Sequence, residues 1–342
     1  MIGDLPVFWL FAVFAVAGLA VVLSSIRATR LADIIADRTQ IGEAMAGGLI
    51  LGGATSLAGV VVSVNAALEG DASFAFSNAV GGIAAQTLFL AIADTIYKKV
   101  NLEHAAAEPT NLFQGVMLIV LLSMPLCAMA GPEIAYFGIH PISVVLFLTY
   151  LYGVGVSSSV SEQPMWKPVQ TSDTREDEPE DDAEPEKSAR GPITSFIGLV
   201  AIMAVGGWVI SQVGGSFIER FGLSSSLVGS LITAVVTSLP ELVTTLVAVR
   251  RGALQLAVGG IIGGNTFDTL FVVFSDLAYR DGSLYHAIGT TDLYWLGTGI
   301  LMTSILLAGL IARQRRGPGG IGVESVAMLA IYFAAAFFEV FG

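Results

Sequence analysis

Ten apolar runs, each long enough to cross a membrane, constrain this chain more than any other feature of its sequence. A helix needs about 20 residues to span about 30 Å of hydrocarbon. The runs therefore predict an all-α, polytopic membrane protein with ten transmembrane helices in two groups of five. The first group covers residues 6–26, 43–68, 73–97, 112–130 and 137–156, and the second covers residues 193–216, 225–249, 253–279, 291–312 and 320–341.

The composition supports the same class of protein. Of the 342 residues, 54% are apolar and only 13% are charged, whereas a soluble domain carries about 25% charged residues. This balance excludes a soluble globular enzyme and a disordered chain. The single cysteine, Cys127, also excludes a disulfide framework and a thiolate metal cluster.

Much of the formal net charge of −12 lies in one segment between the two groups. Residues 157–190 hold ten acidic and four basic side chains, together with several prolines and serines. A segment of this kind buries too little apolar surface to fold alone, so we expect a solvated linker, with cation sensing as an alternative role. The predicted organisation is a first five-helix repeat at 1–156, an acidic linker at 157–192 and a second five-helix repeat at 193–342.

The basic residues predict the orientation of the ten spans. Fourteen of the sixteen lysines and arginines fall on the side of the linker, and only Arg220 and Arg280 fall on the other side. Basic loops face the cytoplasm, so we expect a cytoplasmic linker and both termini outside. The short linker and small loops favour a prokaryotic plasma membrane.

The two groups of five are related in sequence. Thr55, Ser56 and Leu57 recur 182 residues later as Thr237, Ser238 and Leu239. The same offset, without a gap, pairs other glycines, threonines and aspartates, which chance similarity between apolar helices would not favour. Because five is an odd number, the second copy must be inverted relative to the first. Inverted-topology repeats are typical of alternating-access transporters, with substrate near the bilayer midplane.

A proline within one span identifies the first group of chemically active residues. Pro240 lacks an amide proton, so it should free the carbonyl of Val236 and open the helix. Thr237 and Glu241 are four residues apart and share a helix face. With Ser238 they offer only oxygen donors, which hard cations such as Ca²⁺ and Na⁺ prefer.

Two acidic residues lie within apolar runs. Glu241 follows Pro240, and Asp268 follows a glycine-rich stretch at 259–264. A charged side chain at mid-membrane is costly and indicates function. We therefore predict that both are cation ligands. The alternative is a structural role, in which each carboxylate is paired inside the bundle.

These residues carry a resemblance to a known family. The segments T-S-L-P-E-L-V-T-T-L-V-A-V-R-R-G and A-V-G-G-I-I-G-G-N-T-F-D resemble the second α-repeat of the calcium/cation antiporters, the Na⁺/Ca²⁺ exchanger superfamily. The resemblance implies that the second and third helices of each repeat surround a central cation site. It also implies that the first helix of each repeat slides across them. Its metal-binding positions here are Glu241, Asp268, Thr237 and Ser238.

The first copy departs from this pattern. Ala58 and Gly59 occupy the positions of the proline and glutamate, and Gln86 matches Asp268. The resemblance therefore carries over Thr55, Ser56 and Gln86 as neutral metal ligands but no glutamate. The missing charge predicts weaker Ca²⁺ binding or selection of a less charged ion. We also expect Gly59 to leave a space that water could fill.

The function that these patterns favour is secondary active cation antiport, most simply Na⁺/Ca²⁺ exchange, without ATP or a covalent intermediate. We expect no enzyme activity and no cofactor. The expected partners are Ca²⁺, Na⁺ and the lipid bilayer, not nucleic acid. Two alternatives stay open: a monovalent Na⁺/H⁺ or K⁺ exchanger on the same fold, and a transport-dead membrane sensor or scaffold. The sequence leaves the stoichiometry, direction and oligomeric state open.

Overall fold

A computed structural model describes residues 2–39, 52–97, 100–169, 171, 190–315, 317 and 320–342. Within these residues the chain is helical, and the one β-feature is an isolated bridge between Tyr136 and Ile139. The helices are η1 (Ile2–Asp4), α1 (Val7–Thr39), α3 (Gly52–Leu68), α4 (Ala72–Tyr97), α5 (Leu102–Ala105), α6 (Pro109–Ala130), α7 (Pro141–Glu162), α8 (Arg190–Phe221), α9 (Ser225–Leu227), the π-helical η3 (Val228–Thr233), α10 (Ala234–Thr237), α11 (Leu239–Arg251), α12 (Leu254–Ala278), α13 (Leu284–Ala287), α14 (Thr290–Ala312) and α15 (Val323–Phe341).

Eight of the described helices are long and apolar enough to span a membrane. A ninth candidate is a bent pair, Ser225–Thr237 with Leu239–Arg251, whose halves meet at an angle of 44°. The predicted span at 43–68 corresponds to α3, and its first nine residues lie outside the described part of the chain. The described helices therefore support a polytopic membrane protein.

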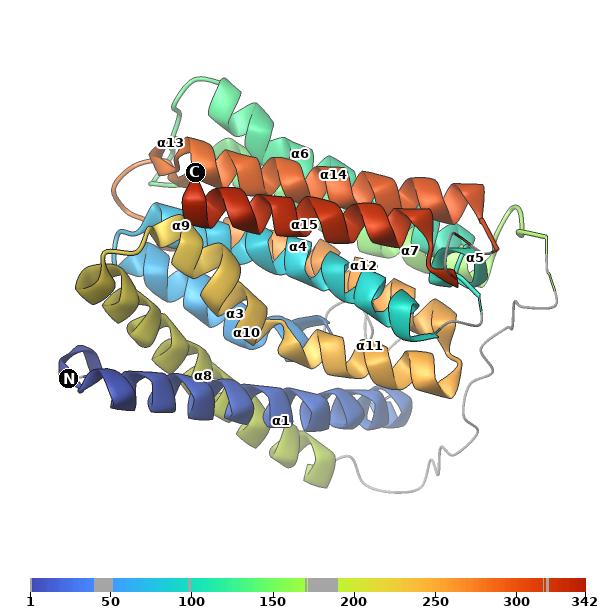
Figure 1. The fold of residues 1–342 in the computed structure, drawn as a ribbon, viewed down its shortest axis with the longest axis horizontal. Coiled ribbons are helices and arrows are strands. Elements are labelled where there is room, and N and C mark those ends of the chain that lie inside the picture. Colours follow the sequence, from blue (N-terminus) through green and yellow to red (C-terminus); the bar gives the residue numbers. More distant parts are fainter. Residues whose placement is uncertain are drawn as a thin grey trace.

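Corresponding helices of the two halves keep a nearly constant separation along the chain. α4 begins at Ala72 and α12 at Leu254, and α7 begins at Pro141 and α15 at Val323. Both separations equal the 182 residues that also separate Gln86 from Asp268. α1 and α8 lie side by side and run in opposite directions (Figure 1). The structure therefore aligns the two halves at the same offset as the sequence repeat.

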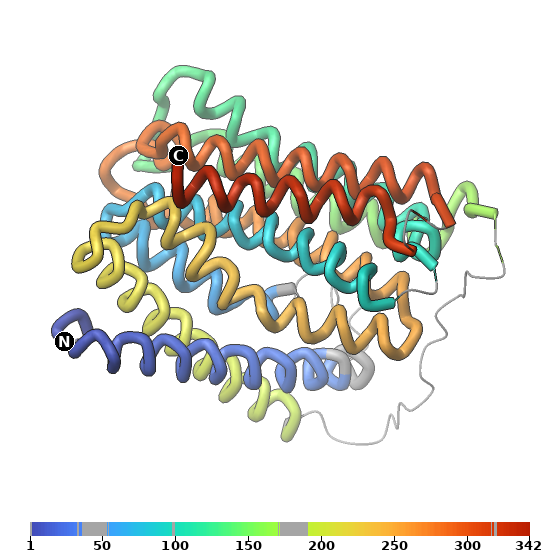
Figure 2. The backbone as a smooth tube through the Cα atoms, viewed as in Figure 1, coloured from blue at the N-terminus to red at the C-terminus, as the bar shows by residue number. Residues whose placement is uncertain are grey.

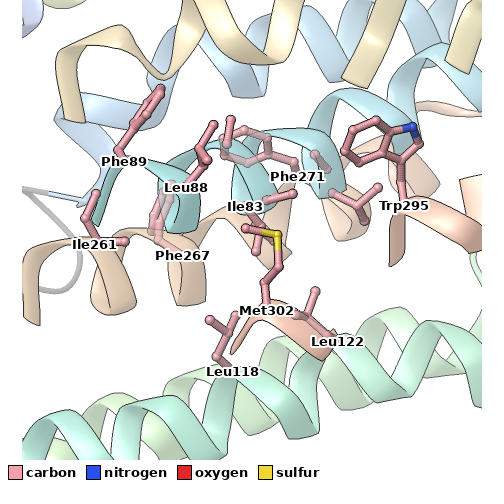
Figure 3. Packing of buried hydrophobic residues seen from close by; sticks show 14 of the residues in the cluster. Ile83, Leu88, Phe89, Leu118, Leu122, Ile261, Phe267, Phe271, Trp295 and Met302 are labelled. Atoms are coloured by element: carbon pink, nitrogen blue, oxygen red, sulfur yellow. The ribbon is translucent and has the colours of Figure 1, made fainter. Parts of the chain in front are cut away.

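The most buried helices, α4 and α12, lie at the centre of the molecule. In their apolar windows 83% and 78% of the residues are buried, compared with 22% for α8. Figure 2 traces α1 and α8 along one side of this centre and α14 and α15 along the other. Figure 3 shows Phe267 and Phe271 of α12 beside Ile83 and Leu88 of α4. Such central helices are screened from lipid, which permits them to carry polar residues.

Glycines permit α4 to approach the π-helical segment η3 closely. A Cβ atom on Gly81 would lie only 2.4 Å from Cα of Ser230. A Cβ atom on Gly229 would likewise lie 2.9 Å from the carbonyl oxygen of Phe74. Small residues allow this close packing of helix backbones in membranes.

The contact at Gly81 gives a test of the packing. We expect Gly81→Ala to lower the thermal stability of the purified protein, because backbone atoms of η3 must move; overpacking typically costs about 1–3 kcal/mol. Gly260→Ala is the matched control, since its Cβ would meet no atom within 4 Å. Melting monitored by size-exclusion chromatography in detergent checks the difference. Equal melting temperatures for the two variants would contradict the close approach.

Two equivalent aspartates close opposite ends of the bundle. We call these the linker end, where α7 ends and α8 begins, and the terminal end, where both chain termini lie (Figure 1). At the linker end, Asp94 accepts backbone N–H bonds from Leu102 (3.0 Å) and Gly322 (2.8 Å). At the terminal end, Asp276 accepts them from Leu284 (3.3 Å) and His140 (2.8 Å). Each donor pair is related by the 182-residue offset, so the two aspartates make equivalent hydrogen bonds at opposite ends of the bundle.

Candidate functional site

The predicted helix break is present beside Pro240. α10 ends at Thr237, Ser238 separates the two segments, and α11 begins at Leu239. A proline in the first turn of a helix needs no amide donor, which is why a new helix can begin here. The break places Glu241 in the first turn of α11. In the other half α3 is continuous from Gly52 to Leu68, consistent with the lack of a proline at Ala58.

The centre of the site is a hydrogen bond between two equivalent residues. The side-chain amide of Gln86 in α4 donates to Oδ2 of Asp268 in α12 over 2.5 Å. Both side chains are 1% exposed. Because the two residues occupy matching positions in the two halves, this bond lies where the halves meet. That is where a repeat-built transporter is expected to bind its substrate.

Two serines repeat the same relation around this centre. Ser56 of α3 lies against the carboxylate of Asp268, and the hydroxyl of Ser238 accepts a 3.3 Å hydrogen bond from Gln86. Ser56 and Ser238 are themselves separated by 182 residues. A Cβ atom on Gly82 would lie 3.5 Å from Oγ of Ser238. α4 can therefore approach the broken helix closely at this point.

Glu241 lies at the same site without a hydrogen-bonded partner of ordinary geometry. It is 5% exposed, and both carboxylate oxygens are buried and unpaired. Thr55 of α3 is close enough to interact with it, and so is the carboxylate of Asp268. Within the described residues, these two acids contact hydroxyl groups, a side-chain amide, a backbone N–H and each other. Two buried carboxylates in such surroundings require a cation or protons for charge balance.

Six of the seven predicted ligands contact one another at this site. The seventh, Thr237, directs its hydroxyl group to its own helix. Its hydroxyl donates to the carbonyl oxygens of Thr233 (2.9 Å) and Ala234 (3.2 Å) of its own helix. Thr237 is buried, and its hydroxyl oxygen keeps lone pairs that could accept or coordinate. The six connected residues are Thr55, Ser56, Gln86, Ser238, Glu241 and Asp268.

The expected space at Gly59 is not empty, so that prediction was wrong. A Cβ atom on Gly59 would lie 2.6 Å from Cε2 and 3.0 Å from Cζ of Phe271. The aromatic ring of Phe271, which is 4% exposed, therefore packs directly on the backbone of Gly59. At the position where the second half has the carboxylate of Glu241, the first half has Gly59, and the ring of Phe271 from the second half leaves no room there for water.

Two asparagines near the site were not predicted as site residues. Asn265 is completely buried; its side-chain amide donates to Thr87 over 3.0 Å, and its Oδ1 has no partner. Its position three residues before Asp268, on the same helix face, could have identified it. Asn78 donates to the carbonyl of Gly59 (3.2 Å) and accepts from Thr233 (2.7 Å). It thereby connects α3, α4 and η3.

Comparison with known proteins agrees with this architecture. The sequence model of the family described as sodium/calcium exchanger protein matches residues 9–158 and 191–341. The putative antiporter CaxA of Alkalimonas amylolytica is 26% identical over 312 residues, which covers 90% of this chain and 94% of that protein. The crystal structure of an H⁺/Ca²⁺ exchanger, CAX, matches with a TM-score of 0.70 at 12% identity, covering 97% of this chain and 85% of the other. The sodium–calcium exchanger NCX_Mj matches with a TM-score of 0.57 at 16% identity, covering 96% and 98%.

Buried carboxylates at the centre of a bundle of membrane-spanning helices indicate a site for cations or protons. The match across both halves shows that this chain belongs to the sodium/calcium exchanger family. It is therefore a membrane antiporter of cations, as the resemblance implied.

Proposed function

We propose that this protein exchanges Na⁺ for Ca²⁺ across the membrane by alternating access at the site around Gln86 and Asp268. The observation that carries the proposal is the pair of buried carboxylates, Glu241 and Asp268, which have no basic partner among the described residues. Two such charges match one divalent cation, and oxygen ligands suit a hard ion. In this proposal the neutral oxygens come from Thr55, Ser56, Gln86, Thr237 and Ser238.

The proposal includes an architecture and an orientation. The architecture is ten spans in two inverted five-helix repeats, with boundaries at 1–156 and 193–342 and the acidic linker 157–192 between them. The matching helix positions and the antiparallel α1 and α8 support it. The basic residues near the linker end favour a cytoplasmic linker and external termini, in a prokaryotic plasma membrane.

Alternating access in this protein would involve α1 and α8. The two helices pack against each other, and both contact α3 of the central group. Only 28% and 22% of the residues in their apolar windows are buried, so both helices lie on the outside of the bundle. This arrangement supports sliding of the first helix of each repeat, which the family resemblance implied.

Transport by the purified protein in liposomes tests the proposal. Vesicles loaded with Na⁺ and diluted into Na⁺-free buffer should take up ⁴⁵Ca²⁺, whereas vesicles with K⁺ on both sides should not. The same vesicles with an imposed pH gradient and no Na⁺ measure H⁺-driven uptake. Uptake that needs only the pH gradient would replace Na⁺ by H⁺ as the counter-ion. Cation flux without Ca²⁺ transport would favour the monovalent alternative, and no cation-dependent flux from folded protein would favour a sensor or scaffold.

A further inference from the structure

The linker end carries two carboxylates that the terminal end lacks. Both ends have the same arrangement of hydrogen bonds, here called the frame, in which one aspartate accepts two backbone N–H bonds. This aspartate is Asp94 at the linker end and Asp276 at the terminal end. At the terminal end the frame is completed by a neutral side chain: the Tyr285 hydroxyl shares a 2.8 Å hydrogen bond with Ser143. The residue 182 positions before Tyr285 is Glu103. A carboxylate is therefore not required to close the frame.

The second additional carboxylate is that of Glu324. Its counterpart at the terminal end is Ile142, and the counterpart of His140 is Gly322. A Cβ atom on Gly322 would lie 3.2 Å from Oε2 of Glu103, 3.3 Å from Oδ2 of Asp94 and 3.3 Å from Oε2 of Glu324. Three carboxylate oxygens therefore converge where Gly322 leaves space.

Two of these oxygens have no hydrogen-bond partner. Both oxygens of Asp94 accept backbone N–H bonds, and Oε1 of Glu103 accepts from Ser325 over 3.2 Å. Oε2 of Glu103 and Oε2 of Glu324 are buried and unpaired, and Glu103 is only 2% exposed. A Cβ atom on Gly309 would lie 3.1 Å from Cγ of Glu103 and 2.5 Å from Cγ of Glu324. The two glutamate stems thus lie together against α14.

The surrounding charged groups do not complete the pair in the described structure. His104 bonds to the carbonyl of Arg313 (2.7 Å) and to Thr171 (3.0 Å). The guanidinium of Arg313 donates to carbonyl oxygens of residues 169 and 104. Arg315 is exposed and has an interaction of its own. Lys98, Lys99 and Arg316 lie outside the described residues. The acidic residues of α12 and α14 lie away from this pair: Asp268 is near the middle of the bundle, and Asp276 and Asp292 are near the terminal end.

We propose that Glu103 and Glu324 share one proton, and that this proton-binding site fastens α5 to the linker end of the bundle. One proton satisfies both unpaired oxygens through a charge-assisted O–H···O⁻ bond. It also removes one of three neighbouring negative charges, which repel one another in a poorly solvated space. Among the described residues no group of three or more His, Cys, Asp or Glu side chains is arranged to hold a metal ion.

The ionisation of Glu103 agrees with this assignment. Burial, followed by the neighbouring charges of Asp94 and Glu324, raises the pKa of Glu103 from 4.5 to about 7. In the docked state Glu103 is therefore protonated up to about pH 7, whereas an opened, solvated α5 releases its proton above about pH 4.5. Between these values rising pH favours opening. Below and above this window the opening equilibrium is independent of this proton.

Amide hydrogen exchange of the purified protein in nanodiscs tests the proposal. After correction for intrinsic exchange rates, the protection of α5 amides should fall by up to about tenfold per pH unit, or about 40-fold from pH 5 to pH 7, and level off above about pH 8. Glu103→Gln should hold α5 closed at every pH, because its amide N–H can donate to Glu324 in place of the proton. Glu219→Gln, which alters an exposed glutamate of α8, should keep the wild-type dependence.

A second variant and an addition of Ca²⁺ complete the test. If Glu103→Gln does not fold, Glu103→Tyr copies the terminal end and should also remove the pH dependence. Protection that is flat with pH in the wild-type protein would overturn the proposal. Protection that rises with added Ca²⁺ at constant pH, but does not respond to pH, would replace the proton by a metal ion. None of these outcomes depends on which cations the protein exchanges.

Discussion

Glu241→Gln is expected to abolish Na⁺-driven Ca²⁺ uptake, with a loss of at least about 100-fold. At an effective dielectric constant near 20, a divalent ion about 4 Å from a carboxylate gains on the order of 8 kcal/mol before desolvation. A net loss of only about 3 kcal/mol already exceeds a 100-fold change in affinity. The first half has no carboxylate at Gly59 to compensate. Initial rates of ⁴⁵Ca²⁺ uptake into liposomes measure the effect.

The same variant separates binding from folding. Glutamine has nearly the shape of glutamate, and Glu241 and Asp268 are like charges buried close together. We therefore expect the Ca²⁺-free variant to melt at the same temperature as the wild type or higher, while Ca²⁺ no longer stabilises it. Glu219→Gln should transport normally. Wild-type uptake by Glu241→Gln would exclude Glu241 as a ligand and, with it, the proposed site.

The sequence was sufficient to predict several features of this site. The gap-free offset that pairs Thr55 and Ser56 with Thr237 and Ser238 also pairs the two ends of the Gln86–Asp268 hydrogen bond. Pro240 predicted a helix break because a missing amide proton is a property of the residue itself. Such features depend on local chemistry and on the alignment of the halves, and both can be read directly from the chain.

Other features depend on contacts between distant residues, which the sequence does not specify. Nothing at Gly59 identifies Phe271, more than 200 residues away, as the ring that covers it. The hydroxyl of Thr237 could face the site or its own helix, and only the packing of η3 decides between them. The network of Asn78 and the π-helical turns of η3 likewise require the neighbouring helix to be placed first.

Gly59→Glu combined with Phe271→Ala is expected to strengthen Ca²⁺ binding on the order of 100-fold. The substitution at residue 271 removes the ring that now lies 2.6 Å from the Cβ position, and the new carboxylate takes its place at the side of the site opposite Glu241. A third negative charge raises the attraction for a divalent ion more than for a monovalent one. A proline is not introduced at Ala58, because it would bend the helix. The backbone of Ala58 packs closely on α8, where a Cβ atom on Gly207 would lie 2.6 Å from its carbonyl oxygen. Calorimetric titration of Ca²⁺ and Na⁺ into the purified variant measures the change.

The matched control has the same shape but no charge. Gly59→Gln with Phe271→Ala should leave Ca²⁺ affinity near the wild-type value, so the difference between the two double variants isolates the carboxylate. Gly59→Glu alone should melt well below the wild type, because its side chain meets Phe271 and overpacking costs about 1–3 kcal/mol before the buried charge is counted. If both double variants bound Ca²⁺ equally, the charge missing from the first half would not determine selectivity. Tight binding by the charged variant alone would show that the Gly59–Phe271 contact, rather than the fold, limits this antiporter to two carboxylates.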